Sequence, residues 1–164
     1  MKDRMEQRQV GGAAIGARLR RLSERIDREA NAIYAACGVD FEQRWYGVLS
    51  LLDERGSLSV VDIARLLGVT HVAVSQVRRD LMGAGLVMAT PDEADGRRRT
   101  LSLSEEGRAL VLRLQPMWDA LNRAAEGLNA EAGDPSAALD RLQAALDRAS
   151  LGNRFDAEAG RKAI

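Results

Sequence analysis

The stretch that decides the fold spans residues 58–87 and reads LSVVDIARLLGVTHVAVSQVRRDLMGAGLV. Ser59 is followed three residues later by Asp62, a capping box that predicts a helix over residues 60–67. Thr70 is the type of residue that caps a helix, and it precedes a second helical stretch. The glycine between the two segments leaves room only for a tight turn, so the stretch predicts a helix-turn-helix.

The residues that follow predict a β-hairpin with an arginine-rich tip. Leu86–Thr90 has the composition of a strand, Pro91–Gly96 is turn-forming, and Leu101 and Leu103 alternate with polar residues in a return strand. A helix-turn-helix followed by such a hairpin is a winged helix. Its known physical use is to bind duplex DNA, with the second helix in the major groove.

The second helix of the motif has one apolar face and one chemically varied face. Val74, Val77 and Leu81 share the apolar face, which is expected to be core. On the varied face, Gln76 can make bidentate contacts with adenine, and Arg79 can reach guanine or a phosphate. At the start of this helix, Thr70 and His71 are predicted DNA-binding residues, with His71 a phosphate contact. Ser75 can contact a base or a phosphate, and Val72 and Ala73 can touch thymine methyls.

The hairpin tip supplies a second predicted DNA contact. Arg97 is assigned to the minor groove, whose negative potential attracts guanidinium groups. Arg98 and Arg99 are assigned either to backbone phosphates or to ion pairs with the nearby carboxylates Asp92, Glu93 and Asp95. A solvated run of charges on a turn is the alternative for the whole triplet.

Composition and length indicate a mainly helical protein. The 164 residues are 46% hydrophobic, 29% charged and only 4% aromatic, so the core is expected to consist mainly of Leu, Val, Ile and Ala. The N-terminus is charged, and no apolar run approaches the ~18 residues that span a bilayer. These observations predict a cytoplasmic location.

Few residues suit metal binding or catalysis. Cys37 and His71 are the only Cys and His, which excludes an internal disulfide and an ordinary zinc site within one chain. No His lies near a Ser or Cys nucleophile, and no Gly-rich phosphate loop follows a predicted strand. The sequence therefore predicts no metal, no cofactor and no enzymatic activity.

These residues resemble the MarR-type winged-helix transcription regulators. The likeness is specific over residues 58–87 and over DEADGRRRTLSLSEEG, residues 92–107, and it extends over about residues 13–150. In that family a wing aspartate two residues before an arginine orients it, which maps onto Asp95 and Arg97. Leu103-Ser104-Glu105-Glu106-Gly107 matches the family's start of the next helix. The resemblance implies an obligate homodimer whose first and last helices intertwine, regulated by a small molecule or by thiol oxidation.

The flanking helices give their own argument for a homodimer. They carry more apolar positions than a core of about ninety residues between them can cover, and a two-fold partner would cover the rest. The predicted fold is mainly α with a small β-hairpin wing. Its expected segments are a mobile arm (1–12), an N-terminal dimerisation helix (13–38), a winged helix-turn-helix lobe (39–104) that begins with a helix over about 41–54, C-terminal dimerisation helices (105–151) and a tail without helical periodicity (152–164).

Two further features leave alternatives open. Aromatic and Met side chains could line an effector pocket, although helical spacing of such residues is also typical of core packing: Tyr34, Phe41, Trp45, Tyr46, Met117 and Trp118. Cys37 could be a redox sensor, but no Lys or His lies close in sequence, so a buried inert thiol is the expectation.

The leading functional hypothesis is a homodimeric, sequence-specific regulator that binds double-stranded DNA at an inverted repeat and responds to a ligand or another signal, most simply as a repressor. The alternative is a winged-helix protein-interaction module that does not bind DNA. A formal net charge of zero and the apolar start of the second motif helix favour that alternative. A third hypothesis, an accessory subunit of an acyltransferase, rests on a resemblance to regulators fused to an acetyltransferase domain.

Overall fold

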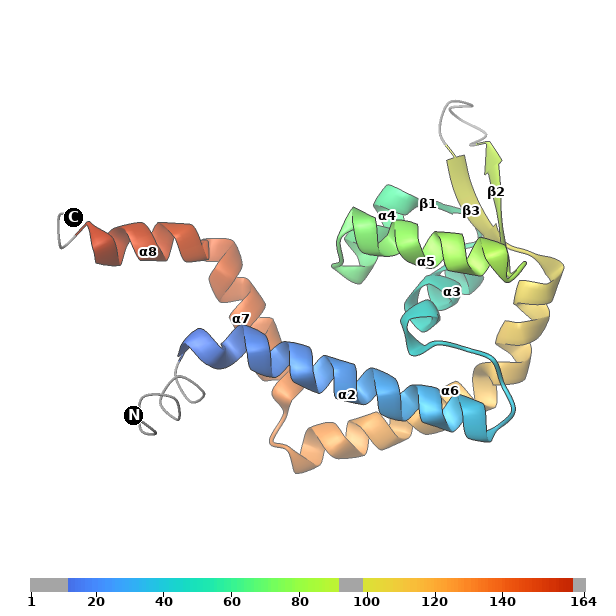
Figure 1. The fold of residues 1–164 in the computed structure, drawn as a ribbon, viewed down its shortest axis with the longest axis horizontal. Helices are drawn as coiled ribbons and strands as arrows, with labels where there is room; N and C mark the ends of the chain where they lie inside the picture. The colour runs from blue at the N-terminus through green and yellow to red at the C-terminus, as the bar shows by residue number, and fades with distance from the viewer. Residues whose placement is uncertain (1–11, 92–98, 161–164) are drawn as a thin grey trace. The chain divides into compact units, whose positions relative to one another are not determined.

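The computed structural model describes residues 12–91 and 99–160, and the chain divides into two compact units, residues 1–115 and 116–164. The division falls inside a long helix at Pro116, which has no amide hydrogen for the helical hydrogen-bond ladder. Figure 1 shows the elements in chain order: η1 (Gly12–Ala14), α2 (Ile15–Ala36), α3 (Gln43–Arg55), β1 (Leu58–Ser59), α4 (Val60–Leu67), α5 (His71–Gly83), β2 (Val87–Pro91), β3 (Arg99–Leu103), α6 (Glu105–Glu131), α7 (Pro135–Arg148) and α8 (Leu151–Ala159).

The helix-turn-helix predicted from the sequence is confirmed as α4 and α5. The Ser59 hydroxyl accepts a hydrogen bond from the backbone N–H of Asp62 at 3.1 Å, and Thr70 caps α5 in the same way through Ala73 at 3.2 Å. Between the helices, Gly68 has a φ of 65°, a left-handed conformation that glycine adopts without strain. The chain bends by 118° from α4 to α5, within the range of about 90–120° that is typical of this motif.

The predicted hairpin is confirmed as β2 and β3, which pair antiparallel. Their register places Val87 opposite Leu103 and Pro91 opposite Arg99. The short strand β1 adds to the other edge of β3, so the sheet order is β1-β3-β2. The hairpin is therefore anchored at its base by the strand that leads into α4.

Unit 1 encloses a continuous core. The apolar face of α5, formed by Val74, Val77 and Leu81, is buried as predicted. The largest fully buried side chains come from α2, α3, α4, α5, β3 and the start of α6: Tyr34, Val48, Leu49, Leu52, Ile63, Val74, Leu81, Leu101, Val111 and Leu114. Helix α3 begins at Gln43, two residues later than predicted, because Glu42 has extended backbone with φ −110° and ψ 133°.

A close backbone contact joins the hairpin to α6. Ser104 caps α6, since its hydroxyl accepts a hydrogen bond from the Gly107 N–H at 2.9 Å and donates one to the Gly85 carbonyl at 2.7 Å. A Cβ added at Gly107 would lie 2.0 Å from the carbonyl oxygen of Leu86. Only glycine fits there, and this explains the Gly of the Leu-Ser-Glu-Glu-Gly sequence.

Unit 2 contains one element that the sequence analysis does not predict. Residues Leu151–Ala159 form helix α8, where a tail without periodicity is expected. Ser150 caps this helix through Asn153, and the Arg154 guanidinium donates to the carbonyl oxygens of Ala149 and Ala145 at the end of α7. These hydrogen bonds, rather than an apolar stripe, account for the helix.

Within the described residues, no single helix has both the length and the apolar character needed to cross a membrane, and only the sharply bent pair α4 and α5 meets both requirements when taken together.

Candidate nucleic-acid interface

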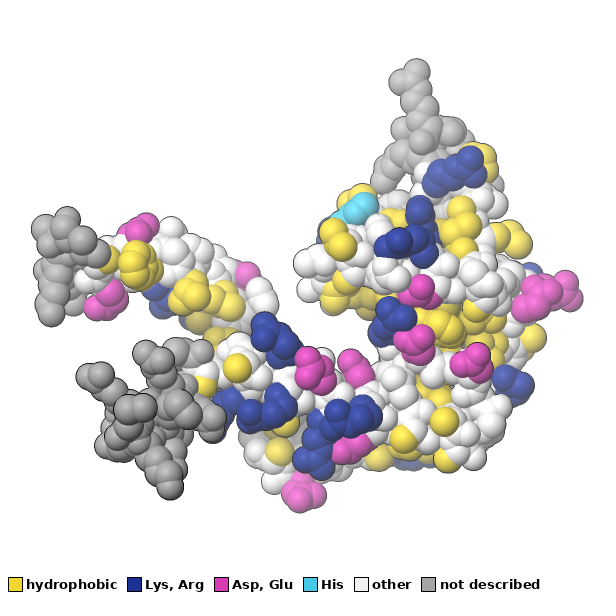
Figure 2. All heavy atoms as spheres, viewed as in Figure 1, with side chains coloured by type: hydrophobic (Ala, Val, Ile, Leu, Met, Phe, Trp, Pro, Cys, Tyr) yellow, Lys and Arg dark blue, Asp and Glu magenta, His cyan; other side chains and the backbone are white. Residues whose placement is uncertain are grey.

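The outer face of α5 is exposed along most of its length. Val72 has 76% of its surface exposed, and Ser75 is half-buried. Five more of the predicted DNA-binding residues are exposed: Thr70, His71, Ala73, Gln76 and Arg79. Figure 2 shows Lys and Arg side chains over α5 and at the base of the hairpin, with hydrophobic side chains between them. The predicted DNA-binding residues of α5 therefore share one accessible surface.

The polar side chains of this face interact with one another. The Gln76 amide nitrogen lies 3.3 and 3.4 Å from the two carboxylate oxygens of Asp80, one turn further along α5. The Gln76 amide oxygen accepts a hydrogen bond from the Arg79 guanidinium. An amide has two N–H donors and an oxygen with two lone pairs, so one donor and one acceptor of Gln76 stay available. That pair matches the N7 acceptor and N6 donor of adenine.

At the base of the wing, one of the predicted arginines is described by the structure. Arg99 is the first residue of β3 and is exposed. The hydroxyls of Thr90 and Thr100 lie 3.4 Å apart across the hairpin, a contact that ties its two strands together. The other predicted wing residues, Asp95, Arg97 and Arg98, lie outside the described residues, as do Asp92 and Glu93.

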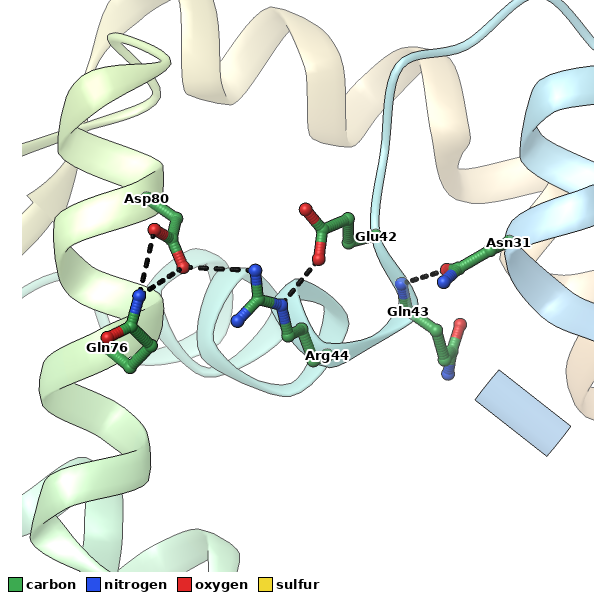
Figure 3. Close-up of polar contacts among 6 residues, drawn as sticks. All are labelled: Asn31, Glu42, Gln43, Arg44, Gln76 and Asp80. Carbon is green, nitrogen blue, oxygen red and sulfur yellow. Dashed lines mark hydrogen bonds and ion pairs between the residues drawn. The ribbon is translucent and has the colours of Figure 1, made fainter. Parts of the chain in front are cut away.

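Sequence reasoning missed a residue of α3 that supports this surface. The Arg44 guanidinium lies 3.2 Å from a carboxylate oxygen of Asp80 on α5 and also pairs with Glu42 (Figure 3). The hydrogen bond that the Arg44 guanidinium donates to Glu42, together with the charges of both carboxylates, holds the pKa of Arg44 above its ordinary value despite partial desolvation. Residues 44 and 80 are far apart in the sequence, and no local pattern could have joined them.

The residues of the predicted effector pocket divide between the two units. Tyr34 and Trp45 are buried in unit 1, where Phe41 contacts both rings at centroid distances of 4.6 and 5.7 Å. Tyr46 is half-buried in the same unit, whereas Met117 and Trp118 belong to unit 2. The aromatic cluster of unit 1 packs as core, and the pocket stays a prediction.

The expectation of a buried thiol is wrong, because Cys37 is exposed at the end of α2. It follows the last residue of the helix and lies one residue before Gly38, whose φ of 68° turns the chain away. Over residues 12–91 and 99–160, no group of three His, Cys, Asp or Glu side chains is arranged to hold a metal ion.

The two-helix motif, the paired hairpin and the exposed outer face of α5 define a winged helix-turn-helix protein. Residues 38–98 match the model of the MarR family. The winged helix-turn-helix lobe is therefore similar to the MarR family of transcriptional regulators, and similar solved structures share the fold over most of the chain.

Three of these structures illustrate the likeness. A probable transcriptional regulator from Pseudomonas aeruginosa is 29% identical, with a TM-score of 0.60 over 78% of this chain and 96% of that chain. BpsR from Bordetella bronchiseptica, whose DNA binding is regulated by 6-hydroxynicotinic acid, is 24% identical, with a TM-score of 0.65 over 79% of this chain and 92% of that chain. MepR of S. aureus in complex with DNA is 22% identical, with a TM-score of 0.65 over 80% and 98%. No curated protein sequence gives a significant match.

Proposed function

We propose that this protein is a homodimeric, sequence-specific transcriptional regulator that binds double-stranded DNA at an inverted repeat, and that it is a repressor released by a ligand or another signal. The observation that carries the proposal is the exposed, chemically varied face of α5 on a helix-turn-helix. The DNA binding of the similar protein BpsR is regulated by a small molecule, and this supports the proposal that a ligand regulates this protein too. A cytoplasmic location, where such a regulator meets its DNA, belongs to the same proposal.

The proposal assigns base readout to α5 and phosphate contacts to its N-terminus and to the wing. Gln76 reads adenine, and Arg79 contacts a guanine edge or a phosphate. Val72 and Ala73 contact thymine methyls. Ser75 contacts a base or a phosphate, and Thr70 and His71 contact the DNA backbone. The wing contacts, in and beside the minor groove, are assigned to Asp95, Arg97, Arg98 and Arg99.

Exposed apolar side chains support the homodimer. On α2 they recur at helical spacing, at Ile15, Leu19, Leu22, Ile26 and Ile33. On α7 they include Leu139 and Leu146. A second copy would cover these stripes and would set the two α5 helices about one DNA turn, ~34 Å, apart, which calls for an inverted repeat.

A mobility-shift experiment with the DNA that flanks the protein's own gene tests the proposal. With ~6 to 10 phosphate contacts per dimer, affinity should fall by ~10³ to 10⁵ between 50 and 200 mM salt. Arg99→Ala should weaken binding to all sequences, whereas Gln76→Ala should change the preferred base at one position in each half-site. A flat salt response, or no preference for any sequence, would refute the proposal.

One observation favours a second function, docking of another protein on the same surface. Val72 is three-quarters exposed, and Val61, Leu66 and Val69 of the α4–α5 region are also exposed. Clustered apolar side chains are typical of protein-binding surfaces. The same salt titration separates the two functions, because a protein-binding module would show no steep, sequence-selective binding to duplex DNA.

A further inference from the structure

We propose that Arg44, which lies on α3 outside the helix-turn-helix, is a positioning residue for base readout, because it holds the Asp80 carboxylate that orients the amide of Gln76. The inference rests on the proposed DNA-binding function and adds a residue that sets its specificity without touching a base. Figure 3 shows the chain of contacts from Arg44 through Asp80 to Gln76.

Asp80 needs a cation because of where it lies. It belongs to α5, the helix assigned to a DNA groove, and its side chain is 26% exposed. A carboxylate near phosphates is repelled unless a positive charge compensates it, and the lower dielectric constant of a half-buried site makes that compensation stronger. The Arg44 guanidinium at 3.2 Å provides that charge and also fixes the position of the carboxylate.

Asp80 in turn orients Gln76. The two residues are one helical turn apart, so their side chains lie on the same face of α5. The amide nitrogen of Gln76 points to the Asp80 carboxylate, and its oxygen accepts from Arg79. Both ends of the amide are therefore held, with the order of donor and acceptor set before DNA arrives. A preoriented amide loses less conformational freedom on binding, and it discriminates better against bases that present the opposite order.

The position of Arg44 is itself set by α2. Gln43 is the first residue of α3, and its backbone N–H donates to the Asn31 side-chain oxygen at 2.7 Å. The Tyr34 hydroxyl donates to the Gln43 side-chain oxygen at 2.9 Å. Two hydrogen bonds to α2 thus hold the residue just before Arg44, so the start of α3 is a fixed support rather than a loose loop end.

A direct phosphate contact is the competing role for Arg44, since 45% of its side chain is exposed. The two roles predict different measurements. Loss of a phosphate contact lowers affinity for all sequences and reduces the slope of log affinity against log salt by about 1 per contact. Loss of a positioning residue leaves that slope unchanged and alters the preference at the one base pair that Gln76 reads.

The test begins with selection of preferred duplexes from random-sequence DNA by the full-length protein, and with Gln76→Ala to locate the base pair that Gln76 reads. Arg44→Gln is then measured on the selected duplex and on its variants at that base pair. We expect discrimination at that position to fall at least about fivefold, the low end of what one bidentate amide–adenine contact supplies, with no change in the salt slope. Arg44→Lys keeps the charge beside Asp80 and should retain most of the preference.

Two further variants complete the design. Asp80→Asn keeps an oxygen acceptor for Gln76 but removes the ion pair, so it should reduce the same preference, and the double variant with Arg44→Gln should be no worse than either single one. Arg55→Gln is the matched control, since Arg55 is an exposed arginine of α3 whose ion pair is with its neighbour Glu54. It should leave the preference unchanged.

Three results would overturn the inference: an unchanged base preference in Arg44→Gln, a reduced salt slope, or additive effects of Arg44→Gln and Asp80→Asn. Thermal unfolding of each variant shows whether the lobe stays folded, so a general loss of structure is recognised by a lowered Tm together with loss of binding to every duplex. Failure of the wild-type protein to select any sequence would instead refute the proposed function itself.

Discussion

The winged lobe in unit 1 encloses a core of buried apolar side chains, whereas the last two helices of unit 2 bury none. In unit 1, buried apolar residues come from η1, α2, α3, α4, α5, β2, β3 and the start of α6, while one face of α2 stays exposed. In unit 2, helices α7 and α8 have no buried residue at all. Their exposed apolar side chains, with one more from the end of α6, are Leu128, Leu139, Leu146, Leu151 and Phe155.

The difference indicates two kinds of stability. The winged lobe can hold its shape by its own packing, because a filled core stabilises it at roughly 25 cal/mol for each Å² of apolar surface buried. Helices α7 and α8 bury no residue, so they are not stabilised in this way, although most helical stability in proteins comes from packing of an apolar face. A second copy of the chain is the partner that the proposed dimer supplies.

The largest expected effect is on that dimer. Leu139→Glu places a charge on the exposed apolar face of α7, where Leu139 is 46% exposed. A two-fold interface contains the residue twice, and each buried Leu contributes about 1.5–3 kcal/mol, so association should weaken roughly 10²- to 10⁴-fold. Sedimentation over a range of protein concentrations measures the shift to monomer.

The matched control is Val61→Glu, which makes the same kind of change on α4 in unit 1, where Val61 is 56% exposed. Because α4 lies outside the helices assigned to the dimer, the control should leave association unchanged. If both variants weaken association equally, the exposed apolar face of α7 is not the dimer interface.

The next effect concerns the lobe alone. Gly107→Ala places a Cβ 2.0 Å from the Leu86 carbonyl oxygen, too close for any side-chain adjustment to relieve. The backbone at the junction of β2 and α6 must move, which should lower the free energy of unfolding by about 3 kcal/mol. Urea denaturation followed by circular dichroism measures this loss.

Gly83→Ala is the comparison for that variant, because a Cβ at Gly83 meets nothing within 4 Å. It should raise the free energy of unfolding by up to about 1 kcal/mol through better helix propensity. If Gly107→Ala proves as stable as Gly83→Ala, the tight junction is not a determinant of the lobe.

Much of the fold could be predicted because its signals are local. The bounds of α4, the Ser59 and Thr70 caps, and the turn after α4 each depend on residues within one helical turn. The hairpin was predictable because strand and turn composition alternate within a few residues. Such features follow from short-range geometry, which a sequence displays directly.

The features that escaped prediction depend on contacts between distant or unexpected groups. Helix α8 is supported by Arg154, whose hydrogen bonds reach back to the carbonyls at the end of α7. Arg44 joins the candidate interface only because folding brings α3 against α5. In the candidate site, the sequence predicted which residues of α5 are exposed, but not which residue of another helix holds them in place.

A smaller effect is expected at the cap of α4. The Ser59 hydroxyl accepts from the Asp62 N–H and donates to the Asp62 carboxylate at 2.6 Å, in a position that is 94% buried. Ser59→Ala should lower the free energy of unfolding by about 1 kcal/mol, since it leaves a helix N–H without its cap. Ser57→Ala, at an exposed position two residues earlier, should change it by less than about 0.5 kcal/mol.

The smallest effect is a pH dependence confined to the start of α7. Asp134 adopts a left-handed φ of 61°, and its carboxylate accepts hydrogen bonds from the Asn129 side chain at 3.0 Å and the Ala137 N–H at 3.2 Å. These contacts, the Asn129 hydrogen bond first, lower the pKa of Asp134 below its ordinary value of 3.8. Because the folded pKa lies below the unfolded one, the stabilisation is complete above pH 3.8 and is lost as the pH falls through the folded value.

Amide hydrogen exchange at Ala137 measures this effect where it arises. Its protection should decrease as the pH falls below 3.8, after correction for the intrinsic exchange rate. Asp134→Asn keeps an oxygen acceptor and tolerates the left-handed backbone, so it should keep the cap but abolish that decrease. Other carboxylates titrate in the same range and act equally on both proteins, so the difference between them isolates Asp134. An identical pH response in the variant would mean that the cap of α7 does not depend on the charge of Asp134.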